Sequence, residues 1–355
     1  MSKPRVALLG ANSQVATEVA LFSTLADDLE LIGFVRSDYS AAMLKLLGIK
    51  FVTIDYDCLD KNNKDLLASC DLIVDFSYPS VQTQEILPAI RHMTAAIIQS
   101  LRNGTQYAYM SSIAAFGMPP ESSEIRRYII PRNTYAFIKR RAERLVAAFA
   151  KNKGIVPYIF RLGQVHGVLQ SVTKYFAECI SLRSVTVTGR PNSLCNIIFP
   201  HSIYHAIARC ARRELIPNTT YALVASPQWS LRTLFDYYRE QLQSPCEIIY
   251  VGSTPRRQDL ARGAPLLSAL VFSRGILEPA VMTIYPNLLP RMKAWYRRRA
   301  ISSPARANGS PDILNIVGNV PCPVVEGIYS SVKDTILAQS RIEDKLQTTL
   351  QRNTK

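Results

Sequence analysis

Short, mostly apolar runs alternate with helical stretches up to residue 167, and this rhythm limits the folds open to the chain. Val6–Gly10, Leu29–Val35 and Asp71–Asp75 have the length and composition of strands, whereas Gln14–Leu25 and Tyr135–Ala150 have helical spacing. Strands that are apolar throughout and separated by helices predict a parallel sheet covered on both faces. We therefore expect an α/β fold, a Rossmann-type doubly wound sheet that binds ligands at the carboxyl ends of its strands.

After this first domain, residues 1–167, the rhythm becomes less regular. Residues 168–280 contain a further strand-like run at Thr220–Val224. We interpret them as a smaller C-terminal lobe, partly interwoven with the first domain. Residues 281–355 are a basic extension in which we recognise no motif, although its last part has helical spacing.

The charge balance is strongly basic. The 355 residues include 42 Lys and Arg against 27 Asp and Glu, a net charge of +15. Such a surplus attracts nucleic acid, anionic lipid or a small phosphorylated ligand, and a basic surface without a dedicated partner is the alternative. No apolar stretch is long enough to predict a transmembrane helix.

Cysteine and histidine usage argues against a disulfide scaffold and a metal site. The seven cysteines are scattered and form no C-x-x-C pair, and there are four histidines. This usage favours a reducing compartment, the cytoplasm. His201 and His205 lie four residues apart, but no carboxylate or thiolate completes a ligand set, so we expect no metal.

A loop of small residues follows the first strand. In the dinucleotide-binding fingerprint, glycines allow a tight turn, close approach of the pyrophosphate and packing of helix on strand. Here Gly10 occupies the first position, and Ser13 and Ala16 replace the other two glycines. A plain strand–helix turn is the alternative interpretation of this loop.

Arg36 follows the second strand. An acidic residue at this place binds the ribose 2′-hydroxyl of NAD, whereas an arginine accommodates the 2′-phosphate of NADP. Arg36 therefore indicates NADP, with NAD as the alternative cofactor, and a solvated surface arginine is the structural alternative. Asp55 and Tyr56 follow the third strand and are candidates to contact the adenine, although Asp is also a common turn former.

Three residues suggest proton-transfer chemistry. Tyr135 and Lys139 lie four apart and share one helix face, and Ser112 follows a strand ending at Met110. A nearby ammonium stabilises a phenolate and lowers the pKa of the tyrosine. Such a tyrosine can exchange a proton with a carbinol–carbonyl pair while a nicotinamide exchanges the hydride, and a serine can polarise the substrate oxygen.

Together these motifs resemble those of the extended short-chain dehydrogenase/reductases, the family of NAD(P)-dependent sugar epimerases and dehydratases. The resemblance runs from Val6 to about Ala225. Its motifs occur in family order: Gly10/Ser13/Ala16, Asp55-Tyr56, Asp71–Ser77, Ser111-Ser112 with Gly117, Tyr135 with Lys139, Arg161–Gly167 and Asn196–Ile207.

The resemblance implies roles for individual residues. It makes Ser112, Tyr135 and Lys139 catalytic. The implied substrate-binding residues are Ser111, Ser112, Tyr135 and His166. For His166 the alternative is a purely structural role as a packed, hydrogen-bonded histidine. The implied cofactor-binding residues are Gly10, Ser13, Gln14, Val15, Arg36, Asp55, Tyr56, Phe76, Ser77, Lys139 and Val165.

Departures from the family pattern narrow the reaction. Ile113 and Ala114 replace the Asp-Glu pair that dehydratases of the family carry after the catalytic Ser or Thr, which argues against dehydration. Cys195 stands where nucleotide-sugar enzymes often place an arginine for the diphosphate, so a nucleotide sugar is compatible but not demanded. Arg183 or Arg190 could supply that charge.

The first hypothesis is therefore an NADP-dependent ketoreductase or epimerase acting on a nucleotide-activated sugar or a similar alcohol or ketone. The family also implies a homodimer. The second hypothesis is a cofactor-binding or regulatory protein of the same fold with weakened catalysis. A third, contact with nucleic acid or an anionic membrane surface, rests only on the charge and on Trp295–Arg299, and the nucleic-acid version is disfavoured.

Overall fold

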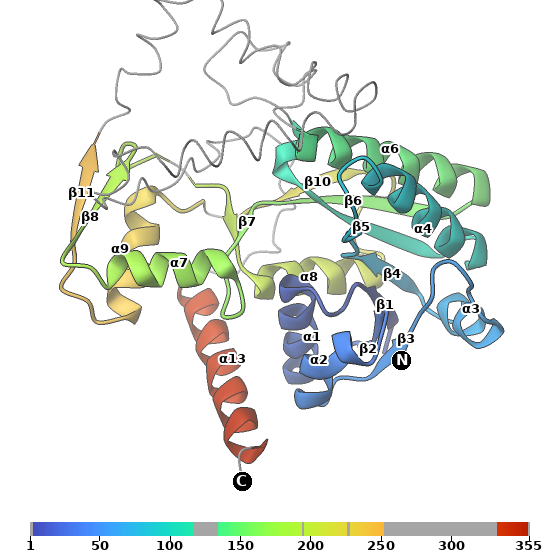
Figure 1. Ribbon diagram of the computed structural model, residues 1–355, viewed down its shortest axis with the longest axis horizontal. Coiled ribbons are helices and arrows are strands. Elements are labelled where there is room, and N and C mark those ends of the chain that lie inside the picture. Colours follow the sequence, from blue (N-terminus) through green and yellow to red (C-terminus); the bar gives the residue numbers. More distant parts are fainter. Residues whose placement is uncertain (1–2, 117–133, 194, 226–227, 252–331, 354–355) are drawn as a thin grey trace, which may run out of the picture.

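The computed structural model describes residues 3–116, 134–193, 195–225, 228–251 and 332–353 (Figure 1). At their centre lies a seven-stranded sheet with the order β10-β6-β5-β4-β1-β2-β3. Every neighbouring pair of its strands is parallel. The expected doubly wound α/β fold is confirmed. The strands of this sheet are β1 (Arg5–Leu9), β2 (Glu30–Val35), β3 (Phe51–Thr53), β4 (Leu72–Asp75), β5 (Gln106–Ser112), β6 (Val156–Leu162) and β10 (Thr220–Leu223).

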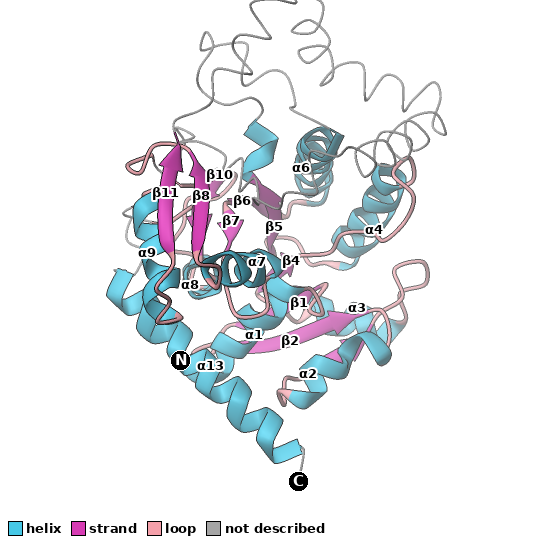
Figure 2. Cartoon of the chain, turned by 60° about the vertical axis from the view of Figure 1, so that its left-hand side comes forward, coloured by secondary structure: helices cyan, strands magenta, loops and turns pink. Residues whose placement is uncertain are grey.

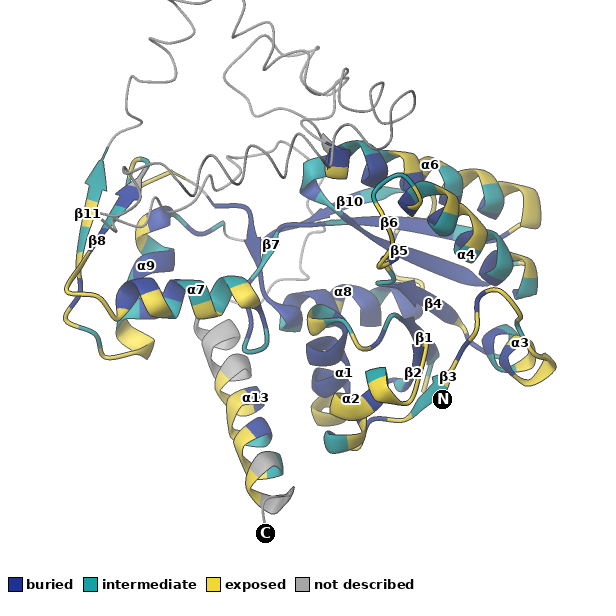
Figure 3. Cartoon of the chain, in the orientation of Figure 1, coloured by how far each residue is buried: buried dark blue, intermediate teal, exposed yellow. Residues whose placement is uncertain are grey.

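The central strands are mostly apolar because both of their faces are buried (Figure 3). In β1, Val6 and Leu8 pack into one core cluster, whereas Ala7 and Leu9 pack into another on the opposite face. Side chains alternate between the faces of a strand, so in a strand buried on both sides a polar residue is buried too and needs a hydrogen-bond partner.

Helices cover the two faces in two groups (Figure 1). On one face lie α1 (Gln14–Ala26), α2 (Ala42–Leu46), which follows the 3₁₀ turn Tyr39–Ala41, and α8 (Pro200–Ala211). On the other lie α3 (Lys61–Ala68), α4 (Ile86–Ser100) and α6 (Thr134–Lys153). The C-terminal helix α13 (Val332–Asn353) joins the first group, because Ile342 and Leu346 are buried in its core cluster.

A third core cluster lies apart from the main sheet, at the left of Figure 1, and Figure 2 brings it to the front. It is built from α7 (Ser171–Ile180), α9 (Leu231–Gln241) and a parallel ribbon of β8 (Ser184–Thr188) and β11 (Glu247–Val251). A short pair, β7 (Gln164–Val165) and β9 (Ile197–Ile198), adjoins it. The run at Thr220–Val224, grouped with the smaller lobe in the sequence analysis, instead forms the edge strand β10 of the main sheet. Gly117 and Trp295–Arg299 lie outside the described residues.

Glu18 ties α1 to the segment after β7. It is fully buried, and its carboxylate accepts hydrogen bonds from the amides of Val168 (3.0 Å) and Leu169 (2.9 Å) and from the side chain of Gln170 (2.7 Å). Burial raises the pKa of this carboxyl group, and these bonds oppose the rise. The three donors hold the start of the third core cluster against α1.

The strand order reverses between β1 and β4, because β2 and β3 lie on one side and β5, β6 and β10 on the other. In doubly wound sheets, the loops at such a reversal diverge and leave a crevice beyond the carboxyl ends of the strands. No helix in the described part of the chain is long and apolar enough to cross a membrane.

Candidate active site

The loop after β1 requires a glycine at its first position. Gly10 has φ = +66°, a conformation that disfavours L side chains. A Cβ there would lie 2.9 Å from the Cα and amide nitrogen of Ser77, which follows β4. Ser13 then caps α1, because its hydroxyl accepts a hydrogen bond from the amide of Ala16 at 3.3 Å. The loops after β1 and β4 are therefore in direct contact at the point where the strand order reverses.

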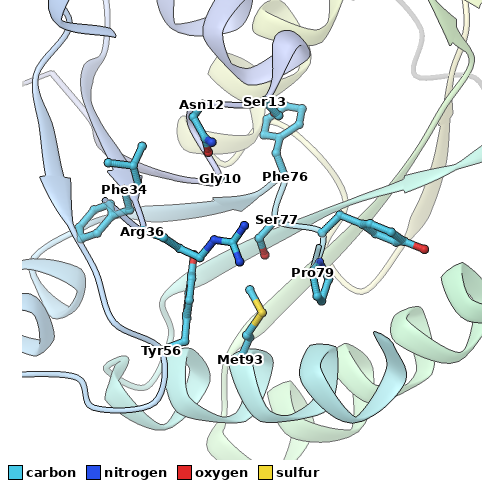
Figure 4. A pocket seen from close by; sticks show the side chains of 12 residues that line it. Gly10, Asn12, Ser13, Phe34, Arg36, Tyr56, Phe76, Ser77, Pro79 and Met93 are labelled. Carbon is cyan, nitrogen blue, oxygen red and sulfur yellow. The ribbon is translucent and has the colours of Figure 1, made fainter. Parts of the chain in front are cut away.

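A cavity of about 150 Å³ opens at this point (Figure 4). The structure brings to it Gly10, Ser13, Arg36, Tyr56, Phe76 and Ser77, all proposed from the sequence to bind cofactor. Its other lining residues, which the sequence analysis missed, are Asn12, Phe34, Val35, Tyr78, Pro79 and Met93. Figure 4 shows the Arg36 side chain reaching into the space between Tyr56 and Ser77.

Several residues expected at the cofactor lie elsewhere among the described residues. Gln14 is exposed at the start of α1, and Val15 and Val165 pack against the first core cluster. Asp55 is exposed, and its carboxylate accepts a hydrogen bond from the amide of Asp57 at 2.9 Å, so it shapes a turn. None of these four side chains lines the described cavity.

A buried carboxyl group bonds to the lining residue Ser77, and the guanidinium of Arg36 lines the cavity itself. Asp75, at the end of β4, is buried and accepts hydrogen bonds from the amide of Ser77 (2.8 Å) and the hydroxyl of Tyr107 (2.6 Å). Burial raises the pKa of Asp75. Burial also raises the pKa of Tyr56, and the positive charge of Arg36 opposes this second rise. The exposed guanidinium of Arg36 beside a helix N-terminus and an aromatic ring is a donor set that fits the phosphorylated adenosine half of a dinucleotide.

Ser112 and Tyr135 meet beyond the end of β5. Ser112 is the last residue of β5, and Tyr135 lies in the first turn of α6 with its side chain 43% exposed. Burial of its hydroxyl end raises the pKa of Tyr135, and a hydrogen bond with Ser112 opposes the rise. The pairing of these two hydroxyls matches what a substrate oxygen between them would require.

The sequence analysis expects the ammonium of Lys139 to lower the pKa of Tyr135, and in the structure this ammonium bonds to the backbone of β5. Lys139 is 6% exposed, and its ammonium donates to the carbonyl oxygen of Met110 at 3.1 Å. The same ammonium lies 5.2 Å from the ring centre of Tyr78 and 5.1 Å from that of Tyr109. Burial lowers the pKa of Lys139 to about 8, and Asp75 and Glu143 oppose this. The raised pKa of Tyr135 has a separate cause, the burial of its hydroxyl group.

A buried ion pair that the sequence analysis missed lies behind Lys139. Arg161 donates two hydrogen bonds to Glu143, at 2.9 and 2.6 Å, and the hydroxyl of Ser111 donates to the same carboxylate at 2.5 Å. Ser111 is 3% exposed, so its hydroxyl serves this network and does not face a substrate. Glu143 continues the face of Tyr135 and Lys139 by one more helical turn, and this spacing was the available signal.

His166 is likewise an internal residue. It is fully buried, its Nδ1 lies 2.7 Å from the hydroxyl of Tyr238, and its ring packs edge-on against Phe176. Burial lowers the pKa of His166 to about 3, so the ring is neutral. His166 is therefore the packed, hydrogen-bonded histidine that the sequence analysis gave as the alternative, and its side chain is enclosed by the third core cluster. The described residues contain no group of three His, Cys, Asp or Glu side chains placed to hold a metal.

The sequence profile of the NAD dependent epimerase/dehydratase family matches residues 6–193. The chain belongs to this family. The match covers the crevice loops, Ser112, Tyr135 and Lys139, and it confirms the resemblance drawn from the motifs. No curated protein matches the chain in sequence.

Solved structures of epimerases share its fold. The UDP-glucuronic acid 4-epimerase from Bacillus cereus in complex with NAD is 14% identical, with a TM-score of 0.55 over 70% of this chain and 87% of that one. The UDP-N-acetylglucosamine 4-epimerase from Methanobrevibacter ruminantium M1 in complex with UDP-N-acetylmuramic acid is 16% identical, with a TM-score of 0.54 over 72% and 87%.

Proposed function

We propose that the protein is an NADP-dependent ketoreductase or epimerase acting on a nucleotide-activated sugar or a similar alcohol or ketone. The observation that carries this proposal is the convergence of Gly10, Arg36 and Ser77 on one cavity, with Ser112 and Tyr135 paired at the next strand end. NAD is the alternative cofactor, and solved structures of the same fold contain it.

The residues divide the binding of the cofactor between them. Gly10 would let the pyrophosphate approach the N-terminus of α1, Tyr56 would contact the adenine, and Arg36 would pair with a 2′-phosphate. Lys139 would donate to hydroxyls of the nicotinamide ribose. When bound, the nicotinamide would supply or accept the hydride.

The protein's own part is to hold the substrate oxygen and to move a proton. Ser112 would donate a hydrogen bond to that oxygen, and the Tyr135 hydroxyl would give or take its proton. Reduction is favoured over epimerisation because an arginine at the 2′-phosphate position selects the NADP pool. We further propose a cytoplasmic homodimer.

The second candidate is a cofactor-binding or regulatory protein with weakened catalysis. It is favoured by one observation, the burial of Lys139 beneath Tyr78 while the pKa of Tyr135 is raised. In this state the ammonium cannot activate the phenol.

Kinetics of Tyr135→Phe separate the two candidates. The protein is incubated with NADPH or NAD and a panel of UDP-sugars, UDP-4-keto-sugars and simple ketones, and products are followed by NADPH absorbance and chromatography. The proposal predicts turnover of at least one compound and a fall of about 10²–10⁴-fold in the Tyr135→Phe variant. Cofactor binding without any turnover would favour the regulatory alternative, and turnover unaffected by Tyr135→Phe would overturn the assigned chemistry.

A further inference from the structure

Tyr78 occupies a junction that the proposed function does not explain. Its ring lies 5.2 Å from the ammonium of Lys139 and 6.1 Å from the ring centre of Tyr135. Tyr78 also lines the cavity that contains Arg36 and Gly10. One side chain therefore stands between the candidate cofactor cavity and both members of the Tyr135–Lys139 pair.

The ammonium of Lys139 is enclosed by aromatic faces. Tyr109, with its ring centre 5.1 Å away, is 1% exposed, and its hydroxyl has no hydrogen-bond partner among the described residues. Tyr78 is 39% exposed. An ammonium is attracted to the face of an aromatic ring, so both rings stabilise it there. Tyr109 is thus a fixed floor under Lys139, and Tyr78 is the solvent-side cover.

The backbone beneath Tyr78 is pinned while its side chain is not. The preceding residue, Ser77, donates its amide to Asp75 at 2.8 Å, and its hydroxyl also bonds to that buried carboxylate. On its other side, Ser77 is packed against Gly10 so closely that a Cβ on Gly10 would not fit. Uncovering Lys139 therefore needs only a rotation of the half-exposed Tyr78 side chain, which is a fast motion.

We propose that Tyr78 is a gate: its ring covers Lys139 in the cofactor-free protein and turns away when a dinucleotide extends from the cavity towards Tyr135. Lys139 then exchanges its contact with the ring for hydrogen bonds to hydroxyl groups of the ligand. Tyr78 is a positioning residue, because it acts on the reaction through Lys139. The ligand half of this proposal rests on the proposed function, whereas the covering of Lys139 does not.

Competitive acetylation tests the cover without any cofactor. Wild type, Tyr78→Phe and Tyr78→Ala are labelled with acetic anhydride at pH 8, and modification of Lys139 is quantified by mass spectrometry relative to Lys64, an exposed lysine on α3. We expect labelling of Lys139 to rise about tenfold in Tyr78→Ala and to stay at the wild-type level in Tyr78→Phe, which keeps the ring. Equal labelling in all three proteins would overturn the gate.

Cofactor titration of the same proteins tests the opening. Displacing the ring costs wild type one cation–aromatic contact, so Tyr78→Ala should bind NADPH about 2- to 30-fold more tightly, with Tyr78→Phe close to wild type. Equal or weaker binding by Tyr78→Ala would overturn the gate. If none of the three proteins binds NADPH or NADH, the proposed function fails, and the acetylation result alone decides whether Tyr78 covers Lys139.

Discussion

Lys139 lies one helical turn after Tyr135 on α6, yet its ammonium is buried against the carbonyl of Met110 while the Tyr135 side chain is 43% exposed. The two residues share a helix face without sharing an environment. The proposed rotation of the Tyr78 ring would let Lys139 reach a ligand from this buried position.

Arg36 is predicted to set the preference for NADP. Replacing it with Asp removes a charge-assisted contact with the 2′-phosphate, so the Kd for NADPH should rise about 10- to 100-fold while that for NADH stays equal or falls. Fluorescence titration with both cofactors measures the two constants. Arg102→Asp makes the same charge change at the opposite, amino-terminal edge of β5 and should leave the ratio unaltered. A parallel loss for both cofactors in Arg36→Asp would remove Arg36 from this role.

His166 should make the protein less stable in mild acid. Its pKa is lowered to about 3 in the native state, whereas an unfolded histidine titrates near 6.5. Below pH 6.5 the unfolded state therefore binds a proton that the native state does not, and stability falls as the pH is lowered towards about 3, by at most about 1.4 kcal/mol per pH unit. Urea unfolding from pH 4.5 to 7.5 measures this slope.

The comparison with a variant isolates the contribution of this one histidine. The stability advantage of wild type over His166→Gln should shrink as the pH falls below 6.5. His92→Gln removes a solvent-exposed histidine whose ion pair with Asp57 is screened by water, and should stay within about 1 kcal/mol of wild type throughout. An advantage that is constant with pH would mean that His166 is protonated or exposed in the native protein.

Glu143 is predicted to stabilise the fold, because Glu143→Ala removes the carboxylate that accepts hydrogen bonds from the partly buried Arg161 and from the buried Ser111. Breaking one side of such a pair costs about 3–5 kcal/mol. Chemical unfolding of Glu143→Ala measures the loss, with Glu240→Ala on the exposed face of α9 as the matched control expected within about 0.5 kcal/mol of wild type. A loss below about 1 kcal/mol would mean that this ion pair contributes little.

The sheet was predictable because its strands are short apolar runs that are recognisable in the sequence. Runs such as Val6–Gly10 and Leu29–Val35 are mostly apolar on both faces, and the observed β1 and β2 differ from them by one residue at one or both ends. The edge strand β10 was seen but was grouped with the smaller lobe, because its place beside β6 depends on contacts distant in sequence. The strands β7 and β9 are two residues long each, too short to give a recognisable hydrophobic pattern in the sequence.

The site was predictable only where a residue's place along the chain fixes its place in space. Gly10, Arg36 and Ser77 follow strand ends that the topology brings to one crevice, so position sufficed. The direction of a side chain is decided by its packing neighbours instead. Spacing alone could not show that Lys139 turns inward or that His166 is enclosed by Tyr238 and its neighbours.

Calorimetric titration of the wild-type protein with NADPH is the decisive test of whether the cavity beside Arg36 binds a dinucleotide. We predict saturable binding at one site per chain, weakened in Arg36→Asp and preserved in Tyr135→Phe, because Arg36 lines the cavity and Tyr135 lies beyond it. Absence of binding at millimolar NADPH and NADH, by a protein that unfolds cooperatively, would contradict a dinucleotide-dependent enzyme.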